Sequence, residues 1–533
     1  MITLVYSKHR INFYINAIKK TTSKNKQVLF LVPEIEDINF WKSYLKKYFS
    51  KGIFVLSSNL TEKQRYKIWE KAKSNEAKII LGTKLALFLP FKKLGLIILD
   101  KEESVNYNSF EKHPYYNGKD LAIKLSKLLN AKVILGASCP SIESYYLTRK
   151  NKYKIITNNI KYSTSSIHII DMKNEIKNGN SSIFSKFLQN SIEKIISSGK
   201  KAILFVNRRG ISTCLLCMDC GYIIKCPNCD VPLVYHKNLP LIEDKSFNTG
   251  YKLICHHCGH QQNPPSLCPK CKSYRIRYLG TGTQKIEYEL KKISPNATAV
   301  RLDTDIAKTK QKQKEILEKF KNGNINFLVC TQLIFSYLKQ LPRLDLISIV
   351  NISHILNLPD FKTGENAFRT ISTLISHLSP REFIVQTYDP ENYVIKYASE
   401  NNYDKFFSKE IKDRKELNYP PFSRLIKLTY QHKISKKAEE EARILGEKLK
   451  QQLKVLSLST KSQDMDFEIL GPAPCFIPKI KNKWRWKIVI KIKCKKFLNG
   501  DIYLSEKQVK IRNDLLKIIP NNWKIEIDPD TLL

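Results

Sequence analysis

The chain lacks any long hydrophobic run. Within its 533 residues, no apolar stretch reaches the roughly 18 residues that a membrane-spanning helix needs. The N-terminal residues from Met1 to Tyr6 read as a buried strand, and the basic, apolar and small-residue segments of a secretory signal are missing. These absences argue against a membrane-inserted or secreted protein, so we expect the chain to work in the cytoplasm.

Acidic residues are also scarce. The sequence has 49 Asp and Glu against 91 Lys and Arg, which gives a net charge of +42. Such an excess favours association with a polyanion, and nucleic acid is the first candidate. Because the sequence is also rich in Asn and Ile, compositional drift toward Lys is the alternative source of the charge. Charge therefore predicts nucleic-acid binding but does not locate it.

Hydrophobic periodicity predicts mainly α/β structure. The chain is too long for one core, so we expect three or more domains. Apolar runs alternate with amphipathic stretches in residues 1–150 and again after Ser166, which is typical of parallel sheets with crossover helices. Strands are expected at 27–33, 78–82, 94–100 and 131–136 in the first region, and at 202–206, 298–302, 326–330, 346–350 and 383–387 in the second.

These patterns predict three domains. Residues 1–160 form the first α/β lobe, and residues 161–400 form the second, which is interrupted by a cysteine-rich insertion at 214–274. Residues 401–533 read as a small α+β domain. The polar stretch 400–420, which ends in Pro420-Pro421, is expected to be a linker before that domain.

Cysteine spacing is the most specific signal. Eight of the thirteen cysteines form four Cys-x-x-Cys pairs. This spacing lets both sulfurs of a pair reach one metal ion, and two pairs complete a tetrahedral four-thiolate site. A site without an open coordination position holds structural zinc. We therefore predict two zinc ions on Cys217, Cys220, Cys226, Cys229, Cys255, Cys258, Cys268 and Cys271.

Spacing alone does not fix which pairs share a metal. We expect nesting, with the inner pairs 226/229 and 255/258 on one ion and the outer pairs 217/220 and 268/271 on the other. His256 and His257 lie between ligands and are interpreted as surface residues. The remaining cysteines are interpreted as ordinary thiols, and they are Cys139, Cys214, Cys330, Cys475 and Cys494.

Short motifs around this module carry a resemblance to a known family. The cysteine pairs lie between Phe205-Val-Asn-Arg-Arg-Gly210 and Gly280-Thr-Gly-Thr-Gln284. Other motifs in the same order are Leu31-Val-Pro-Glu-Ile35, Gly82-Thr-Lys-Leu-Ala86, Asn357-Leu-Pro-Asp-Phe361, Tyr419-Pro-Pro-Phe422 and Gly471-Pro-Ala-Pro474. Together they resemble PriA, or primosomal protein N′, a family of superfamily-2 helicases.

The resemblance implies a particular architecture. It implies two RecA-like helicase lobes, the second carrying the zinc-binding insertion, followed by a C-terminal α+β domain. In the family, a further region that binds the 3′ end of a nascent DNA strand would precede residue 1. The resemblance therefore does not extend to recognition of that end, unless another chain supplies the region.

The nucleotide-contacting motifs depart from the family pattern. The family's Gly-Ser-Gly-Lys-Thr loop corresponds here to Ser7, Lys8, His9, Arg10 and Ile11. Glycines that let backbone amides wrap a phosphate are missing, and so is the hydroxyl that binds Mg²⁺. The family's Asp-Glu-x-His motif is Asp100-Lys101-Glu102-Glu103, in which Lys101 replaces the catalytic Glu.

Two further motifs have changed as well. The stretch from Thr370 to Pro380 lacks the family's arginines, and the stretch from Ile334 to Lys339 replaces an Ala-Lys-Gly-His-Asp pattern. A single charge-stabilising arginine can be worth about 10³-fold in turnover. We therefore expect little ATP hydrolysis, with Arg10 and Asp100 as weak contacts for Mg·ATP and Glu102 as a poor substitute base.

A basic stretch near the C-terminal end predicts a DNA contact. In one continuous strand over 479–490, cations and apolar residues would lie on opposite faces. The cationic face would carry Lys479, Lys481, Lys483, Arg485 and Lys487, and the apolar face Ile480, Trp484, Trp486 and Ile488. A solvated basic strand is the alternative. The resemblance adds Arg208 and Arg209, and an aromatic loop with Tyr107, Phe110, Tyr115 and Tyr116 whose rings could also pack the lobe.

These features predict a replication-restart protein that binds forked or single-stranded DNA and helps to reload the replicative helicase, without robust ATPase or unwinding activity. The resemblance implies primosome proteins, the replicative helicase and single-strand binding protein as partners, and no membrane. Two alternatives stay open. One is an active ATP-dependent 3′–5′ DNA helicase, and the other is a zinc-dependent protein-interaction module of the primosome.

Overall fold

The computed structural model describes most of the chain as two compact units. Unit 1 comprises 1–161 and 497–501, and unit 2 comprises 162–496 and 502–533. The described residues are 1–7, 10–109, 115–157, 165–207, 215–217, 219–220, 222–228, 231–237, 251–256, 258–278, 282–323, 325–458, 466–494, 496–498 and 501–533. No helix within these residues is long and apolar enough to cross a membrane.

Unit 1 is built on a parallel sheet, as its alternating apolar runs predict. The strand order is β3-β4-β2-β5-β8-β1-β9, and every paired neighbour is parallel. The central strands are buried on both faces, as expected for a sheet covered by helices. The strands are β1 (Ile2–Tyr6), β2 (Gln27–Leu31), β3 (Ile53–Leu56), β4 (Ile79–Gly82), β5 (Leu94–Asp100), β8 (Lys132–Ala137) and β9 (Lys154–Thr157).

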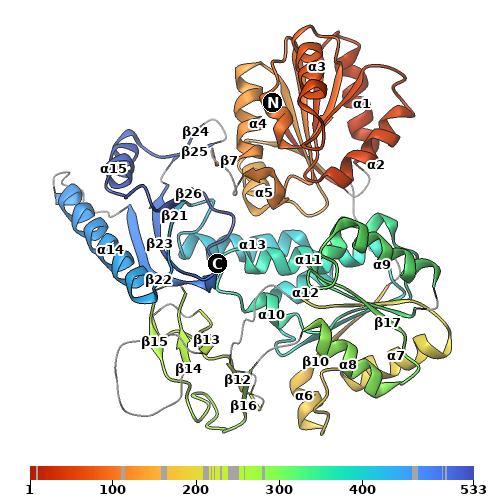
Figure 1. The fold of residues 1–533 in the computed structure, drawn as a ribbon, viewed down its shortest axis with the longest axis vertical. Coiled ribbons are helices and arrows are strands. Elements are labelled where there is room, and N and C mark those ends of the chain that lie inside the picture. The colour runs from red at the N-terminus through yellow and green to blue at the C-terminus, as the bar shows by residue number, and fades with distance from the viewer. Residues whose placement is uncertain are drawn as a thin grey trace. The chain divides into compact units, whose positions relative to one another are not determined.

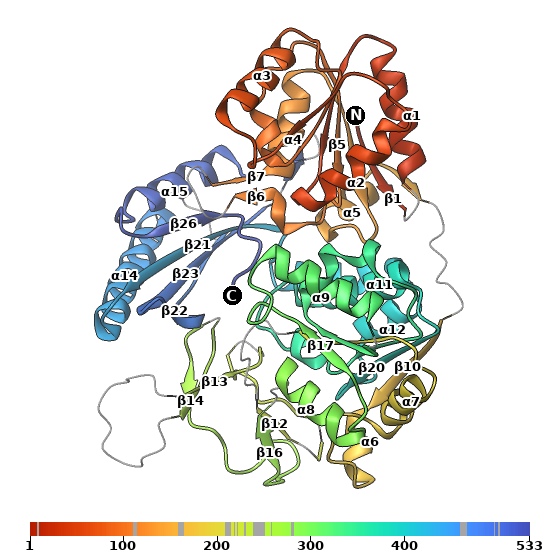
Figure 2. The same ribbon diagram turned by 45° about the vertical axis from the view of Figure 1, so that its right-hand side comes forward.

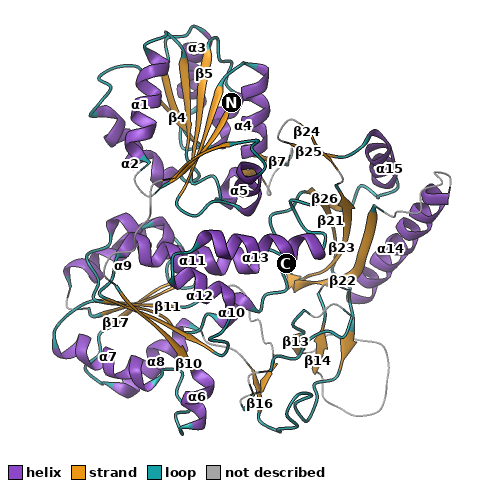
Figure 3. Cartoon of the chain, turned by 180° about the vertical axis from the view of Figure 1, so that it is seen from behind, coloured by secondary structure: helices purple, strands orange, loops and turns teal. Residues whose placement is uncertain are grey.

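Helices cover both faces of this sheet. The helices α1 and α2 lie on one face, and α4 and α5 lie on the other (Figures 1 and 3). Apolar residues of α1 and α2 pack on β2, β4 and β5 and form the main core of the unit. The helices are α1 (Ile11–Thr22), α2 (Ile35–Lys46), α3 (Glu62–Lys73), α4 (Gly118–Leu128) and α5 (Ile142–Arg149).

A second parallel sheet forms the α/β part of unit 2. Its order is β10-β20-β19-β11-β18-β17. The helices α7 and α8 lie on one face, and α9 and α11 on the other (Figures 1 and 3). The strands are β10 (Ser166–Asp171), β11 (Ala202–Phe205), β17 (Ala299–Leu302), β18 (Phe327–Cys330), β19 (Leu346–Ile349) and β20 (Glu382–Thr387). The helices are α6 (Met172–Lys177), α7 (Lys186–Ser197), α8 (Thr283–Ile293), α9 (Lys310–Asn322), α10 (Ser353–Leu356), α11 (Thr363–Leu378) and α12 (Tyr393–Ser399). The predicted fold class, two parallel α/β lobes, is therefore confirmed.

The cysteine-rich insertion leaves the second sheet after β11 and returns at α8. Its short strands are antiparallel, with β12 paired to β16 (Figure 2) and β14 between β13 and β15 (Figure 1). The strands are β12 (Leu215–Cys217), β13 (Val234–Lys237), β14 (Tyr251–Ile254), β15 (Gln261–Gln262) and β16 (Ile276–Tyr278). These sheets share only a small hydrophobic cluster, built around Leu215, Ile224, Leu233 and Leu253, so metal ligation would add to a limited core.

The predicted linker at 400–420 is wrong, because most of it is the helix α13 (Tyr403–Glu416). Phe406 stacks on Phe368 of α11 with ring centroids 4.3 Å apart. Arg414 is 2% exposed and forms ion pairs with Glu365 of α11 at 2.8 Å and with Glu410 at 2.9 Å. The charged composition suggested a solvated segment, but these charges neutralise one another inside the fold.

The C-terminal part of unit 2 is a four-stranded sheet in the order β22-β23-β21-β26, with α14 packed on it. All of its strand pairs are antiparallel. This α+β arrangement agrees with the predicted fold of the C-terminal region. The elements are β21 (Ser423–His432), α14 (Ser435–Leu458), β22 (Phe467–Ile480), β23 (Lys483–Lys493), α15 (Glu506–Lys517) and β26 (Lys524–Ile527).

Candidate metal centre and nucleotide site

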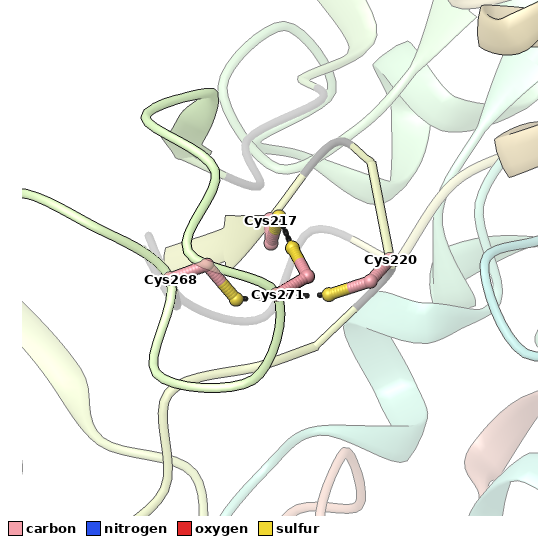
Figure 4. A group of neighbouring side chains, drawn as sticks. All are labelled: Cys217, Cys220, Cys268 and Cys271. Atoms are coloured by element: carbon pink, nitrogen blue, oxygen red, sulfur yellow. Dashed lines mark hydrogen bonds between the residues drawn. The ribbon is translucent and has the colours of Figure 1, made fainter.

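Four cysteines from the two ends of the insertion form an outer cluster. Cys217 closes strand β12, Cys220 follows in the next turn, and Cys268 and Cys271 lie in the turn before β16. Figure 4 shows the four side chains pointing toward one another. The Sγ atoms of Cys217 and Cys271 are 3.5 Å apart, and those of Cys220 and Cys268 are 3.6 Å apart.

The inner cluster contains Cys226, Cys255 and Cys258. The Sγ atoms of Cys226 and Cys258 are 3.6 Å apart. The predicted fourth member, Cys229, lies outside the described residues. The structure thus groups the outer pairs together and the three described inner cysteines together, in agreement with the nested arrangement expected from the sequence.

Both clusters fit a tetrahedral thiolate site. In each, the sulfur atoms lie within 4.8 Å of one another. Four sulfurs at a Zn–S distance of about 2.3 Å would be roughly 3.8 Å apart, close to the distances found here. Gly259 has φ +83°, so the turn after Cys258 uses the left-handed conformation that glycine adopts readily. The chain therefore has two cysteine clusters compatible with two metal sites.

The interpretation of His256 as a surface residue is wrong. Its side chain is 1% exposed, and its Nδ1 lies 2.8 Å from the carbonyl oxygen of Pro474 on β22. The imidazole also meets the ring of Phe476 edge-on, with centroids 5.6 Å apart. His256 thus joins the inner cluster to the C-terminal sheet. His257 lies outside the described residues.

In unit 1, Asp100 at the end of β5 accepts hydrogen bonds from several protein side chains. Arg10 Nε donates to Asp100 Oδ1 at 2.6 Å, and the Tyr14 hydroxyl donates to the same oxygen at 3.1 Å. Trp41 Nε1 donates to Oδ2 at 3.0 Å. Asp100 is fully buried, and Arg10 is 8% exposed. Burial alone would lower the pKa of Arg10, but the Asp100 carboxylate offsets this and raises it.

Bulky side chains also fill the space beside this ion pair. The Tyr14 hydroxyl would lie only 1.4 Å from a Cβ atom placed on Gly136, so the tyrosine needs a glycine at this position of β8. Arg10 Nη1 donates to Ser138 Oγ at 2.9 Å. These contacts hold Arg10 in front of the N-terminal end of α1, where other proteins bind phosphate.

The next two residues form ion pairs of their own. Lys101 Nζ donates to Asp37 Oδ1 at 2.8 Å. Glu102 is 2% exposed and accepts from Lys119 Nζ at 2.9 Å. It also accepts from the Ser141 backbone amide at 2.7 Å and from Ser144 Oγ at 2.9 Å. Burial would raise the pKa of Glu102, but Lys119 and these donors lower it overall.

The other altered motifs are packed into unit 2. Residues from Ile334 to Lys339 form 3₁₀ turns whose Ile334, Tyr337 and Leu338 are buried. Thr370 to Leu378 lie within α11, and the arginine just before them, Arg369, is ion-paired with Glu365. Ser7 lies beside Arg10 and Ile11 begins α1, whereas Lys8 and His9 lie outside the described residues.

The predicted basic strand is wrong in one respect, because residues 479–490 form a hairpin. Lys481 and Asn482 have φ of 47° and 59°, as a two-residue type I′ turn requires. Lys479 pairs with Trp484 across the turn, so it lies on the tryptophan face, with its Nζ 5.2 Å from that ring. The alternation holds only within β23, where Trp486 and Ile488 enter the core.

The cations of this hairpin differ in exposure. Lys479, Lys481 and Lys483 are exposed and Arg485 is half-buried. Lys487 is 3% exposed and donates to the carbonyl oxygen of Leu532, and burial lowers its pKa to about 8. It is therefore a packing residue, contrary to the expectation that it contacts DNA.

The remaining predicted contacts are placed only in part. Tyr107 is 1% exposed, and its hydroxyl lies within hydrogen-bonding distance of the carbonyl oxygens of Leu31 and Asp100, so it packs the lobe. Tyr116 meets Phe88 edge-on, and Tyr115 is half-buried. Arg208, Arg209, Phe110 and Cys214 lie outside the described residues.

Sequence reasoning missed the residues that complete the lobe-1 site. Tyr14, Trp41, Asp37 and Lys119 are brought there from α1, α2 and α4. The one available signal was the presence of unusually polar or aromatic residues on the inner side of amphipathic helices. Long-range pairing of that kind cannot be found from spacing.

Matches to family models agree with this architecture. Residues 415–530 match the model of the primosomal protein N C-terminal domain. Residues 226–241 match the model of the PriA DNA helicase Cys-rich region domain. Together with the two parallel lobes, these matches define a two-lobed α/β protein with a zinc-ribbon insertion.

Curated relatives identify the family. The chain is 33% identical over 528 residues to the replication restart protein PriA of Bacillus subtilis, covering 97% of this chain and 61% of that protein. It is 34% identical to the PriA of Borreliella burgdorferi, covering 94% of this chain and 72% of that protein. The chain belongs to the replication restart protein PriA family, and it spans about 61% of the length of the Bacillus relative.

Two similar solved structures are distant in sequence. A structure of RecG bound to a three-way DNA junction covers 78% of this chain and 43% of that chain, with 12% identity and a TM-score of 0.42. The match to the Hef helicase domain of Pyrococcus furiosus covers 74% of this chain and 94% of that domain, with 12% identity and a TM-score of 0.39.

Proposed function

We propose that this protein binds DNA at stalled or abandoned replication forks and helps to reload the replicative helicase, as a scaffold without robust ATPase or unwinding activity. Family membership supports the replication-restart role. The other primosome proteins, the replicative helicase and single-strand binding protein are its proposed partners. Its proposed place of action is the cytoplasm. We also propose that each cysteine cluster holds one structural zinc ion.

The loss of ATP turnover is supported chiefly by one observation, the hydrogen bonds that Asp100 accepts from protein side chains. Arg10, Tyr14 and Trp41 donate to its two oxygens, so a magnesium ion would have to compete with these donors for Asp100. The water-activating position is Lys101, which is ion-paired with Asp37. Glu102, the possible substitute base, is buried among four donor groups from Lys119, Ser141 and Ser144. Weak nucleotide binding through Arg10 and Asp100 would require breaking a buried ion pair.

The proposed DNA contact is the exposed end of the β22–β23 hairpin, together with Arg208 and Arg209. Lys479, Lys481, Lys483 and Arg485 gather around a rigid turn, where phosphates can approach them from solvent. Each phosphate neutralised by such a cation should add about 0.9 to the slope of log affinity against log salt for duplex DNA.

An ATPase assay separates the scaffold from an active helicase. We expect phosphate release with forked DNA at saturating Mg·ATP to stay well below about 1 s⁻¹, the low end of ordinary enzyme turnover. Turnover above that value in the wild type, and its loss in Asp100→Ala, would establish an active motor and reject the proposal.

A salt titration separates DNA binding from a pure interaction module. In Lys481→Glu/Lys483→Glu, forked-DNA affinity should fall and the salt slope should decrease by roughly 0.9 per lost contact. The matched control is Lys507→Glu/Lys510→Glu, which makes the same charge change on α15. Equal affinity of both variants and the wild type for DNA would place the contact elsewhere. Absence of DNA binding in the wild type would favour the interaction module.

A further inference from the structure

The outer side of α2 carries a row of aromatic rings that neither the metal centre nor the nucleotide site uses. Phe40, Tyr44 and Tyr48 follow one another at four-residue intervals, which places them along one side of the helix and its C-terminal extension. The ring centroids of Phe40 and Tyr44 are 6.1 Å apart, and those of Tyr44 and Tyr48 are 5.6 Å apart. Tyr48 is 43% exposed. We call these three residues the aromatic row.

The aromatic row is distinct from the inward face of the same helix. Trp41, the neighbour of Phe40 in sequence, is 1% exposed and donates to the buried Asp100. Trp41 therefore provides the deep packing of α2, and Phe40 and Tyr44 pack beside it, half-buried against the core of unit 1. Tyr48 is the ring of the row that is most open to a ligand.

Lysines surround the aromatic row. Lys19 of α1 lies over the Tyr48 ring at 5.4 Å, and Lys47 lies over the Tyr44 ring at 5.7 Å. The helices α1 and α2 share one face of the sheet, so their exposed cations belong to one surface (Figure 3). No acidic residue occurs in 1–33 or in 38–61. The other exposed cations of this surface are Lys20, Lys42 and Lys46.

We propose that the aromatic row and its lysines form a binding site for single-stranded DNA in unit 1. This inference rests on the proposed function, because it assigns one part of the fork to this surface. Bases would stack on Tyr44 and Tyr48, and the lysines would contact the flanking phosphates. A lysine over an exposed ring gains less than a base stacked on that ring, so the lysines move to phosphates when DNA arrives.

The rings make the site selective for single strands. In a duplex, the faces of paired bases are covered by their neighbours, so only cations can contact it along its length. Lysines alone bind both forms through phosphates. The aromatic row therefore adds affinity for unpaired bases alone, whereas the surrounding charge attracts either form.

The test compares an oligothymidine with a duplex of the same length, using the full chain. Tyr44→Ala/Tyr48→Ala should weaken oligothymidine binding by roughly tenfold or more, the loss expected for about one stacked base, and should change duplex binding less than twofold. Tyr44→Phe/Tyr48→Phe should keep the affinity, because it retains both rings. The matched control is Tyr66→Ala, which removes a 58% exposed ring from α3 and should have no effect.

The outcomes are distinguishable from a failure of the proposed function. Equal losses for oligothymidine and duplex, an equal loss in Tyr66→Ala, or unchanged oligothymidine binding in the double alanine variant would overturn the proposal. The proposal would also be overturned if the double alanine variant lost binding to anionic vesicles but kept its binding to oligothymidine. If the double alanine variant does not fold, Tyr48→Ala alone is decisive, because that ring is the most exposed of the row. A wild type that binds forked DNA through the hairpin would still support the proposed function.

Discussion

The cysteine-rich insertion and the edge of unit 1 around Asp100 both bring several charged or metal-ligating side chains together, yet they relate to the family pattern in opposite ways. In the insertion, the described cysteines converge into two clusters with sulfur separations near those of a thiolate site. In unit 1, the charged residues at the corresponding motifs form ion pairs with other protein side chains. Arg10 pairs with Asp100, Lys101 with Asp37, and Lys119 with Glu102.

This difference shows what each site contributes to the fold. Small strands in the insertion have little core of their own, so loss of their ligands would unfold them. The parallel sheet of unit 1 has a large apolar core that persists without a nucleotide. Its binding edge can therefore change, provided that each buried charge keeps a partner. Three such pairs leave each of these charges in unit 1 with a partner of opposite sign.

Loss of an inner-cluster ligand should have the largest effect. Structural zinc can contribute ~10–16 kcal/mol to a small domain, so Cys255→Ser should release one zinc ion per chain and unfold the inner part of the insertion. Elemental analysis should fall from about two zinc ions to about one. The control Cys494→Ser changes a buried thiol outside both clusters and should keep two. An unchanged metal content in Cys255→Ser would mean that the inner cluster does not bind zinc.

Removal of Arg10 should have the next largest effect. Arg10→Ala leaves Asp100 buried without its cation, and breaking a buried pair in this way costs about 3–5 kcal/mol. Hydrogen exchange of the β5 and β8 amides should therefore accelerate strongly in the variant. Arg10→Met/Asp100→Asn, which removes both charges, should recover much of the protection. If Arg10→Ala exchanges like the wild type, the ion pair does not stabilise unit 1.

The two regions also differ in how much the sequence could predict. Cysteine spacing predicted the four ligand pairs, because two cysteines separated by two residues can reach one metal ion from a single turn. Alternating apolar runs likewise predicted most strands of both parallel sheets but missed β3, β9 and β10. The ion pairs of lobe 1 could not be predicted from the sequence, because Asp37 and Lys101 are far apart in sequence and meet only through the sheet order. The hairpin at Lys481-Asn482 was missed because period-two charge continues through a two-residue turn without a break.

A pH titration tests the Glu102 environment. Its folded pKa is lowered, so the carboxylate adds stability that is fully present above the ordinary pKa of 4.5 and is lost as pH falls through the folded value. Glu102→Gln should therefore be less stable than the wild type at pH 7, and the gap should narrow below about pH 4.5. Urea unfolding followed by hydrogen exchange in unit 1 measures the gap. If the difference in stability between the wild type and Glu102→Gln grew as the pH fell, the pKa of Glu102 would be raised in the folded protein, not lowered.

Restoring the family's acidic residue at position 101 should have the smallest effect on stability and none on catalysis. Lys101→Glu replaces the partner of Asp37 with a second carboxylate. Because Lys101 is 28% exposed in its side chain, the loss should be only about 1 kcal/mol. Lys101→Met removes the attraction without adding repulsion and should cost less. Phosphate release should not rise in Lys101→Glu, because Asp100 still accepts hydrogen bonds from Arg10, Tyr14 and Trp41 and the edge beside Arg10 remains filled. A DNA-stimulated gain in phosphate release would show that Lys101 alone blocks the motor, and that the other ion pairs open when a nucleotide binds.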